Sequence, residues 1–129
     1  MNYSVRRLPD EKIIVVVLMN RYDFEKNSKE LYDEIDKLMG ADETELYCIT
    51  DLSTLDIDFS DVVVALGSSK RGGPGSPADP RFAQNIFIGT DDMVQFAAQS
   101  MQQTQYGKLD TLVFPSLEEA LLYARARLS

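Results

Sequence analysis

The run "KIIVVVLM", residues 12–19, constrains the fold more than any other stretch of this chain. Its β-branched residues favour an extended strand, and successive side chains on both faces of that strand are apolar. Such a strand has to be covered on both sides, which is typical of a mostly parallel sheet with helices packed on it. Its uninterrupted apolar stretch, Ile13 to Met19, is seven residues long and far too short to span a bilayer.

Segments typical of strands and of helices alternate along the rest of the chain. Strands are predicted at residues 3–8, 12–19, 45–52, 85–89 and 111–114. Helices are predicted at residues 24–39, at 59–69, from Asp91 to the "QYG" of residues 105–107, and from a Ser116 cap to Leu128. Pro9, Asp10 and Glu11 favour a turn between the first two strands. The order β-β-α-β-α-β-α-β-α predicts a single α/β domain, residues 1–129, whose mostly parallel sheet has an antiparallel edge hairpin.

Residue types that are rare or absent exclude several functions. The chain has no histidine, which removes Ser/His and Cys/His nucleophilic catalysis and the commonest zinc ligand. Its one cysteine, Cys48, alternates with neighbours in a strand pattern and is predicted to be a small buried side chain. No catalytic motif is intact, so we expect a protein that is not an enzyme and has no cofactor.

The charge of the chain argues against polyanionic partners. The net charge is −8, and no lysine or arginine lies between Gly40 and Lys70. That interval contains seven acidic residues: Asp42, Glu43, Glu45, Asp51, Asp56, Asp58 and Asp61. Such a surface repels nucleic acid and anionic membranes, so neither is an expected partner. No basic segment precedes the first apolar run, so no secretory signal is predicted and a cytoplasmic location is expected.

Three stretches together resemble a known fold. They are "DLS" at residues 51–53, "NIFIGTDDMVQFAAQ" at 85–99 and "LVFPSLEEALLYAR" at 112–125. With the order of elements, they are similar to SpoIIAA-like proteins of the STAS superfamily (sulfate transporter and anti-sigma-factor antagonist). The resemblance implies a non-enzymatic bacterial regulatory module that binds a protein partner, for example a kinase-like anti-sigma factor.

The resemblance also directs attention to Ser60. In signalling members an Asp-Ser-Ser-Gly turn opens the second helix, and its first serine is phosphorylated by the partner kinase. When this chain is aligned with that motif without gaps, Ser60 falls at the phosphoacceptor position, whereas Phe59, Asp61 and Val62 depart from the motif. The resemblance therefore implies a partner surface at Asp58, Ser60 and Asp61. The alternative is that Ser60 is an ordinary helix N-cap.

Two other kinds of site compete with this interpretation. The glycine-rich stretch "GSSKRGGPGSPADPR", residues 67–81, carries Lys70, Arg71 and Arg81, which could grip a small anionic ligand. Its glycines follow a helix and precede a strand, the reverse of a phosphate-binding loop, so it is more typical of a connector. A Mg²⁺-dependent enzyme built on Asp51, Asp56, Asp58 and Asp61 is the second alternative.

An uncharged glutamine-rich segment suggests one further interaction. The run "AAQSMQQTQYG", residues 97–107, has no charged side chain although the chain as a whole is acidic. Its apolar residues keep helical spacing, so a core helix with an uncharged polar face is one interpretation. The other is that this face is covered in a homo-oligomer.

Overall fold

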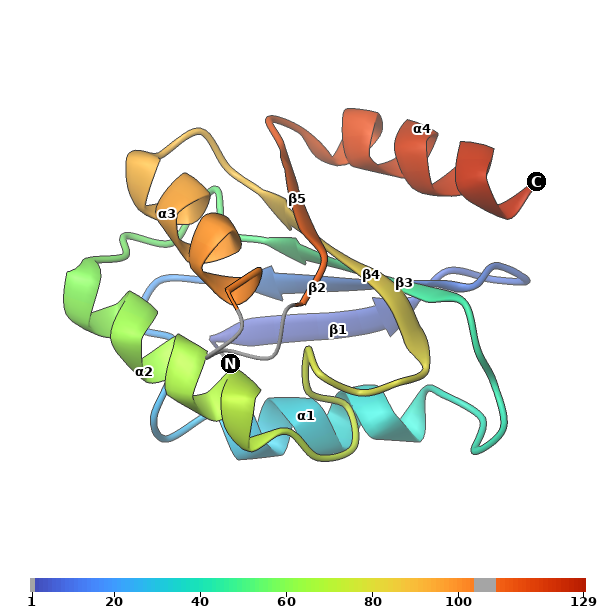
Figure 1. Cartoon of the computed structure of the whole chain (residues 1–129), viewed down its shortest axis with the longest axis horizontal. Helices are drawn as coiled ribbons and strands as arrows, with labels where there is room; N and C mark the ends of the chain where they lie inside the picture. Colours follow the sequence, from blue (N-terminus) through green and yellow to red (C-terminus); the bar gives the residue numbers. More distant parts are fainter. Residues whose placement is uncertain (1, 104–108) are drawn as a thin grey trace.

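The computed structural model describes residues 2–103 and 109–129. Its elements are β1 (Tyr3–Arg7), β2 (Ile13–Leu18), α1 (Ser28–Lys37), β3 (Leu46–Asp51), α2 (Phe59–Arg71), β4 (Phe82–Ile88), α3 (Asp92–Met101), β5 (Thr111–Phe114) and α4 (Leu117–Leu128) (Figure 1). The predicted order β-β-α-β-α-β-α-β-α is therefore confirmed. The "QYG" predicted to end the third helix lies outside the described residues.

The strands form one mostly parallel sheet. Their spatial order is β1-β2-β3-β4-β5, the same as their order in the chain. β1 pairs with β2 antiparallel, with Tyr3 opposite Leu18, whereas β2, β3, β4 and β5 pair in parallel. The turn residues between the first two strands predict an antiparallel edge hairpin, and the structure confirms it.

The helices form a layer on each face of the sheet. Each parallel strand is added on the same side of the one before, so right-handed crossovers carry α1, α2 and α3 to a single face. α4 covers the other face (Figure 1). Along β2, Ile14 and Val16 pack in the core beneath α1, whereas Ile13 and Val15 pack beneath α4. The prediction that this strand is apolar on both faces is confirmed, since all four side chains are buried.

Several boundaries differ from the predictions; β4, for example, begins at Phe82 rather than at residue 85. α1 begins at Ser28 rather than at Phe24, because the Asp23 carboxylate accepts hydrogen bonds from the amides of Glu25 and Lys26 and holds a turn there. α2 continues to Arg71, two residues beyond its predicted end at residue 69, so residues 67–71 of the glycine-rich stretch are helical. Among the described residues, no helix combines the length and the apolar character that crossing a bilayer requires.

Candidate functional site

The N-terminus of α2 is held by two aspartates. Asp58 is the N-cap, and its carboxylate accepts a hydrogen bond of 2.9 Å from the amide of Asp61. The Asp61 carboxylate in turn accepts from the amide of Asp58 at 3.1 Å, which completes a capping box. Hydrogen bonds from the Asp61 amide and the Ser60 hydroxyl lower the pKa of Asp58. The prediction that Ser60 is the N-cap is therefore wrong, because Asp58 already occupies that position.

Ser60 lies instead within the first turn of α2, with its side chain exposed. Its hydroxyl donates a hydrogen bond of 2.8 Å to the Asp58 carboxylate. A phosphate added there would benefit from the helix N-terminus but would meet the negative charges of Asp58 and Asp61. The phosphoacceptor role of Ser60 stays a prediction.

Exposed aromatic side chains lie beside this turn. Phe59 is 60% exposed and Phe96 of α3 is 37% exposed, and their rings stack with centroids 5.7 Å apart. Val63, one turn after Phe59, is 49% exposed. The spacing of Phe59, Val62, Val63 and Leu66 predicts one apolar helical face. For Phe59 and Val63 this prediction is wrong, because both side chains are exposed. α2 is buried instead through Val62 and Leu66, which pack in one apolar cluster with α3.

Phe96 is not singled out by sequence reasoning. The sequence predicts the apolar stripe of α3 from Met93, Val94, Ala97, Ala98 and Met101, and four of these five are buried while Met93 is partly buried. Phe96 lies outside that stripe, and a large aromatic residue outside the apolar stripe of its helix is the signal that could have identified it.

The surroundings of these aromatic side chains are acidic. Asp91 caps α3 and Asp92 lies in its first turn, one turn before Phe96. No lysine or arginine occurs in residues 38–69 or 82–107. We call this region the acidic-aromatic surface, made of Asp58, Phe59, Ser60, Asp61, Val63 and Phe96.

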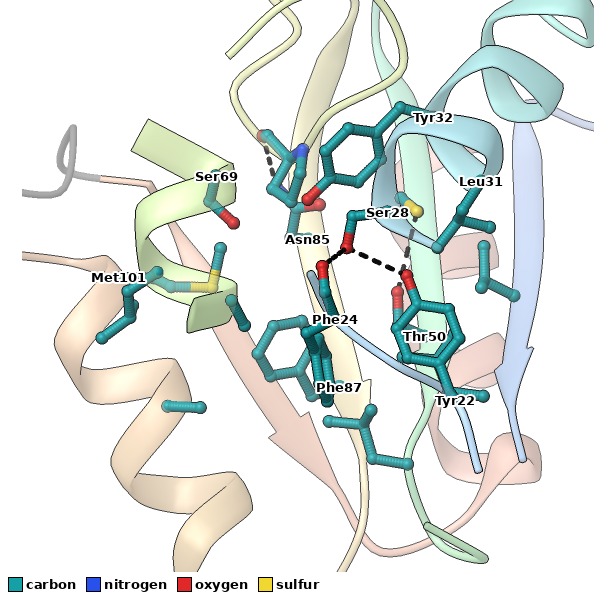
Figure 2. A pocket seen from close by; sticks show the side chains of 18 of the residues that line it. Tyr22, Phe24, Ser28, Leu31, Tyr32, Thr50, Ser69, Asn85, Phe87 and Met101 are labelled. Atoms are coloured by element: carbon teal, nitrogen blue, oxygen red, sulfur yellow. Dashed lines mark hydrogen bonds between the residues drawn. The ribbon is translucent and has the colours of Figure 1, made fainter. Parts of the chain in front are cut away.

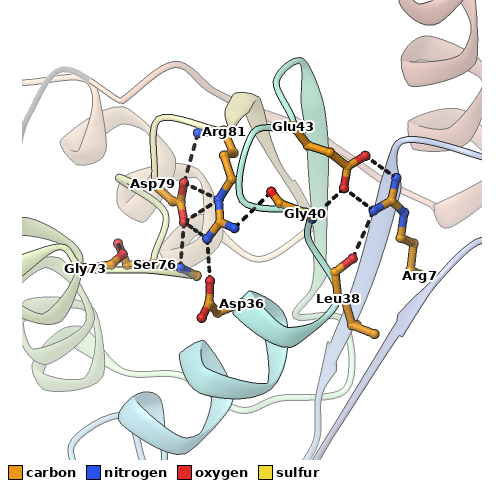
Figure 3. A network of polar contacts seen from close by, with 10 residues as sticks. Arg7, Asp36, Leu38, Gly40, Glu43, Gly73, Ser76, Asp79 and Arg81 are labelled. Atoms are coloured by element: carbon orange, nitrogen blue, oxygen red, sulfur yellow. Dashed lines mark hydrogen bonds and ion pairs between the residues drawn. The ribbon is translucent and has the colours of Figure 1, made fainter.

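The stretch after α2 packs against α1 through Arg81 (Figure 3). Arg81 donates to the Asp79 carboxylate at 2.7 Å and forms a second ion pair with Asp36 of α1. Burial raises the pKa of Asp79, but hydrogen bonds from Arg81 and the Gly75 amide outweigh burial and leave that pKa below its ordinary value. Arg81 therefore joins this connector to α1, and its charge is already balanced by two carboxylates.

The other two cations predicted for anion binding are placed differently. Lys70 and Arg71 are exposed on the last turn of α2, where Arg71 donates to the Ser68 hydroxyl at 3.1 Å. The C-terminus of a helix is its negative end, which stabilises these cations but disfavours an anion. Anion binding by Lys70 and Arg71 stays a prediction, without the contribution of Arg81.

The described residues do not bring the aspartates of the predicted magnesium site together into a cluster. Within residues 2–103 and 109–129, no group of three or more acidic, histidine or cysteine side chains lies close enough to hold a metal ion. Asp58 and Asp61 cap α2, and the Asp51 carboxylate accepts hydrogen bonds from the amide and hydroxyl of Ser53. Local hydrogen bonds therefore engage three of the four carboxylates that the sequence pattern offered to Mg²⁺, those of Asp51, Asp58 and Asp61.

Cys48 is buried in β3, as predicted. Burial raises the pKa of its thiol to about 12. At neutral pH the thiol is protonated and is therefore a weak nucleophile.

The topology defines the class of this protein: a five-stranded α/β domain with three helices on one face of the sheet and one on the other. A solved structure with this fold is that of an uncharacterized protein of the DUF3478 family from Shewanella loihica PV-4, described as having a SpoIIAA-like fold. The TM-score is 0.59 over 95% of this chain and 91% of that chain, at 16% sequence identity. The predicted SpoIIAA-like, STAS-like fold is thus confirmed. No protein-family model and no curated protein matches the sequence.

Proposed function

We propose that this protein is a non-enzymatic regulatory module of the bacterial cytoplasm that binds a protein partner through the acidic-aromatic surface. The exposed stacked pair Phe59 and Phe96 is the observation that carries the proposal. Aromatic side chains dominate the binding energy of many interfaces, because their large apolar area leaves water on binding.

The charges around the pair indicate the chemistry of the partner. The carboxylates of Asp58 and Asp61 flank Phe59, and no basic residue lies in the segments that build α3 and the first part of α2. A complementary partner presents an apolar pocket bordered by lysine or arginine. A kinase-like anti-sigma factor is the partner that the SpoIIAA-like resemblance implies, and phosphorylation of Ser60 would add negative charge at the centre of this surface.

Affinity purification of the tagged protein from its own host, read by mass spectrometry, tests the proposal. We expect the wild-type protein to retain a stoichiometric protein partner. The double substitution Phe59→Ser and Phe96→Ser should weaken binding of that partner at least about tenfold, which corresponds to about 1.4 kcal/mol. Both side chains are exposed, so the variant should keep its fold, which circular dichroism checks.

Leu122→Ser is the matched control, because Leu122 is also an exposed apolar side chain, 66% exposed, and lies on the opposite layer. The control should retain the partner. Equal binding by all three proteins would contradict the proposed surface. The same spectra report whether the peptide containing Ser60 carries a phosphate, and an unmodified peptide would remove the phospho-switch from the proposal.

A further inference from the structure

A cavity lies inside the layer formed by α1, α2 and the sheet (Figure 2). Its volume is about 90 Å³. A single water molecule needs about 10–15 Å³, so the cavity has room for considerably more than one water. Interiors of proteins are normally packed as densely as organic crystals, and a void of this size is therefore unusual.

The packing of the helices explains the void. α2 is packed against α3 through Val62 and Leu66, whereas α1 lies over β1 and β2, and the backbones of α1 and α2 are not closely packed. The side chains that α2 turns toward the cavity include the small residues Ala65 and Ser69. They leave the space between the two helices unfilled, and Gly75 and Pro77 of the connector line it as well.

The lining is apolar over most of its area and carries polar groups only in places. Tyr22, Phe24 and Phe87 contribute aromatic rings, and none of the described lining residues is charged. The Tyr32 hydroxyl lies near Ser28 and Ser69, and burial raises its pKa, so it stays protonated and can donate. Asn85, which donates from its amide nitrogen to the carbonyl oxygen of Pro77 at 2.9 Å, also lines the cavity.

From this lining we infer that the cavity binds a small uncharged molecule that is mostly apolar, about one ring in size, with a single hydrogen-bonding oxygen. A charged ligand would lose its hydration without gaining a counter-charge, because the lining supplies none. An oxygen on the ligand hydrogen-bonds with the Tyr32 hydroxyl or the neighbouring polar groups. The site is independent of the acidic-aromatic surface, which lies on the solvent side of α2.

Phenol and benzene are suitable probes, with benzoate as the charged counterpart of the same ring. Titration monitored by methyl resonances should show that phenol and benzene perturb Ala65, Leu66 and Met101, which line the cavity. Both should raise the melting temperature, whereas benzoate at the same concentration should do neither. Perturbation of surface residues alone, or an equal response to benzoate, would overturn the inference.

Substitutions test separately the apolar space of the cavity and its hydrogen-bonding hydroxyl. Ala65→Leu fills the cavity and should weaken binding of both probes at least tenfold, whereas Leu122→Ser on the exposed side of α4 should leave binding unchanged. Tyr32→Phe removes one hydroxyl and should weaken binding of phenol about twofold to tenfold while leaving benzene unaffected, as expected for one hydrogen bond.

Two outcomes would contradict the inference. If Ala65→Leu bound the probes as tightly as wild type, they would occupy another place. If Tyr32→Phe weakened phenol and benzene equally, the hydroxyl would not be the hydrogen-bonding group. Should Ala65→Leu fail to fold, the positions of the perturbed methyl groups in the wild-type protein still show whether the probes bind in the cavity.

Discussion

At the scale of single residues, Glu43 has the clearest electrostatic environment. Its carboxylate forms two hydrogen bonds with the Arg7 guanidinium, of 2.6 and 2.7 Å, and accepts a third from the Gly40 amide (Figure 3). The contact with Arg7, together with the Gly40 amide, lowers the pKa of Glu43 from 4.5 to about 2. Bidentate contacts of this kind are among the stronger polar interactions in proteins.

The lowered pKa predicts how stability depends on pH. The folded-state pKa lies below the unfolded value, so ionised Glu43 stabilises the fold above about pH 4.5, and the stabilisation is lost as the pH falls toward 2. In urea unfolding, the free-energy difference between wild type and Glu43→Gln should be largest above pH 4.5 and should shrink toward pH 2. The same substitution in an Arg7→Met background should show a much weaker pH dependence. A difference independent of pH would contradict the assignment.

At the scale of elements, the connector between α2 and β4 is closely packed against α1. Arg81 and Asp79 hold it to Asp36, and Gly75 touches the backbone of α1. Gly75 has φ +81°, and a Cβ placed there would collide with the carbonyl oxygen of Tyr32. The glycines and prolines of this stretch therefore serve a structural contact, in agreement with a connector.

Gly75→Ala should be strongly destabilising for this reason. The positive φ and the backbone clash together should lower the free energy of unfolding by more than about 2 kcal/mol. Gly73 is the matched control, since it also has a positive φ, +101°, but no atom lies within 4 Å of the place that a Cβ would occupy. Gly73→Ala should cost only about 1 kcal/mol. Equal costs, measured by urea unfolding, would show that the close approach to α1 does not matter.

At the scale of the whole molecule, the two faces of the sheet are covered unequally. Of the described helices, three cover one face and α4 alone covers the other (Figure 1). α4 approaches the sheet closely because Ala120 and Ala124, both fully buried, face Ile13, Ile49 and Ile86 in one apolar cluster. Small side chains at the contact let α4 pack closely against a face of the sheet that no other described helix covers.

Enlarging one of these alanines tests that contact. Ala124→Leu should lower the free energy of unfolding by about 1–3 kcal/mol, because added methyl groups have no space between the helix and the sheet. Leu122→Ser, on the exposed side of the same helix, should change it by less than about 0.5 kcal/mol. If Ala124→Leu left the free energy of unfolding unchanged, α4 would be able to move away from the sheet without a loss of stability. Thermal unfolding followed by circular dichroism distinguishes the two results.

The order of the elements and the hairpin could be predicted from the sequence because both depend on local patterns. The alternation of β-branched runs with helical spacing depends only on neighbouring residues, as does the turn at Pro9 to Glu11. The burial of β2 on both faces followed from its composition alone. Boundaries were less predictable, because the turn before α1 depends on how one carboxylate, Asp23, pairs with nearby amides.

The sequence by itself thus determined a mostly parallel α/β sheet with an edge hairpin, and it located Ser60 at the N-terminal end of a helix. Only the tertiary structure decided which side chains face solvent or a partner helix, since the pattern of α2 allows either Val62 or Val63 to face inward. It also turned Phe96 toward Phe59, paired Arg81 with Asp36 and left a cavity between α1 and α2. These features join segments far apart in the chain, and local spacing carries no information about how such segments meet.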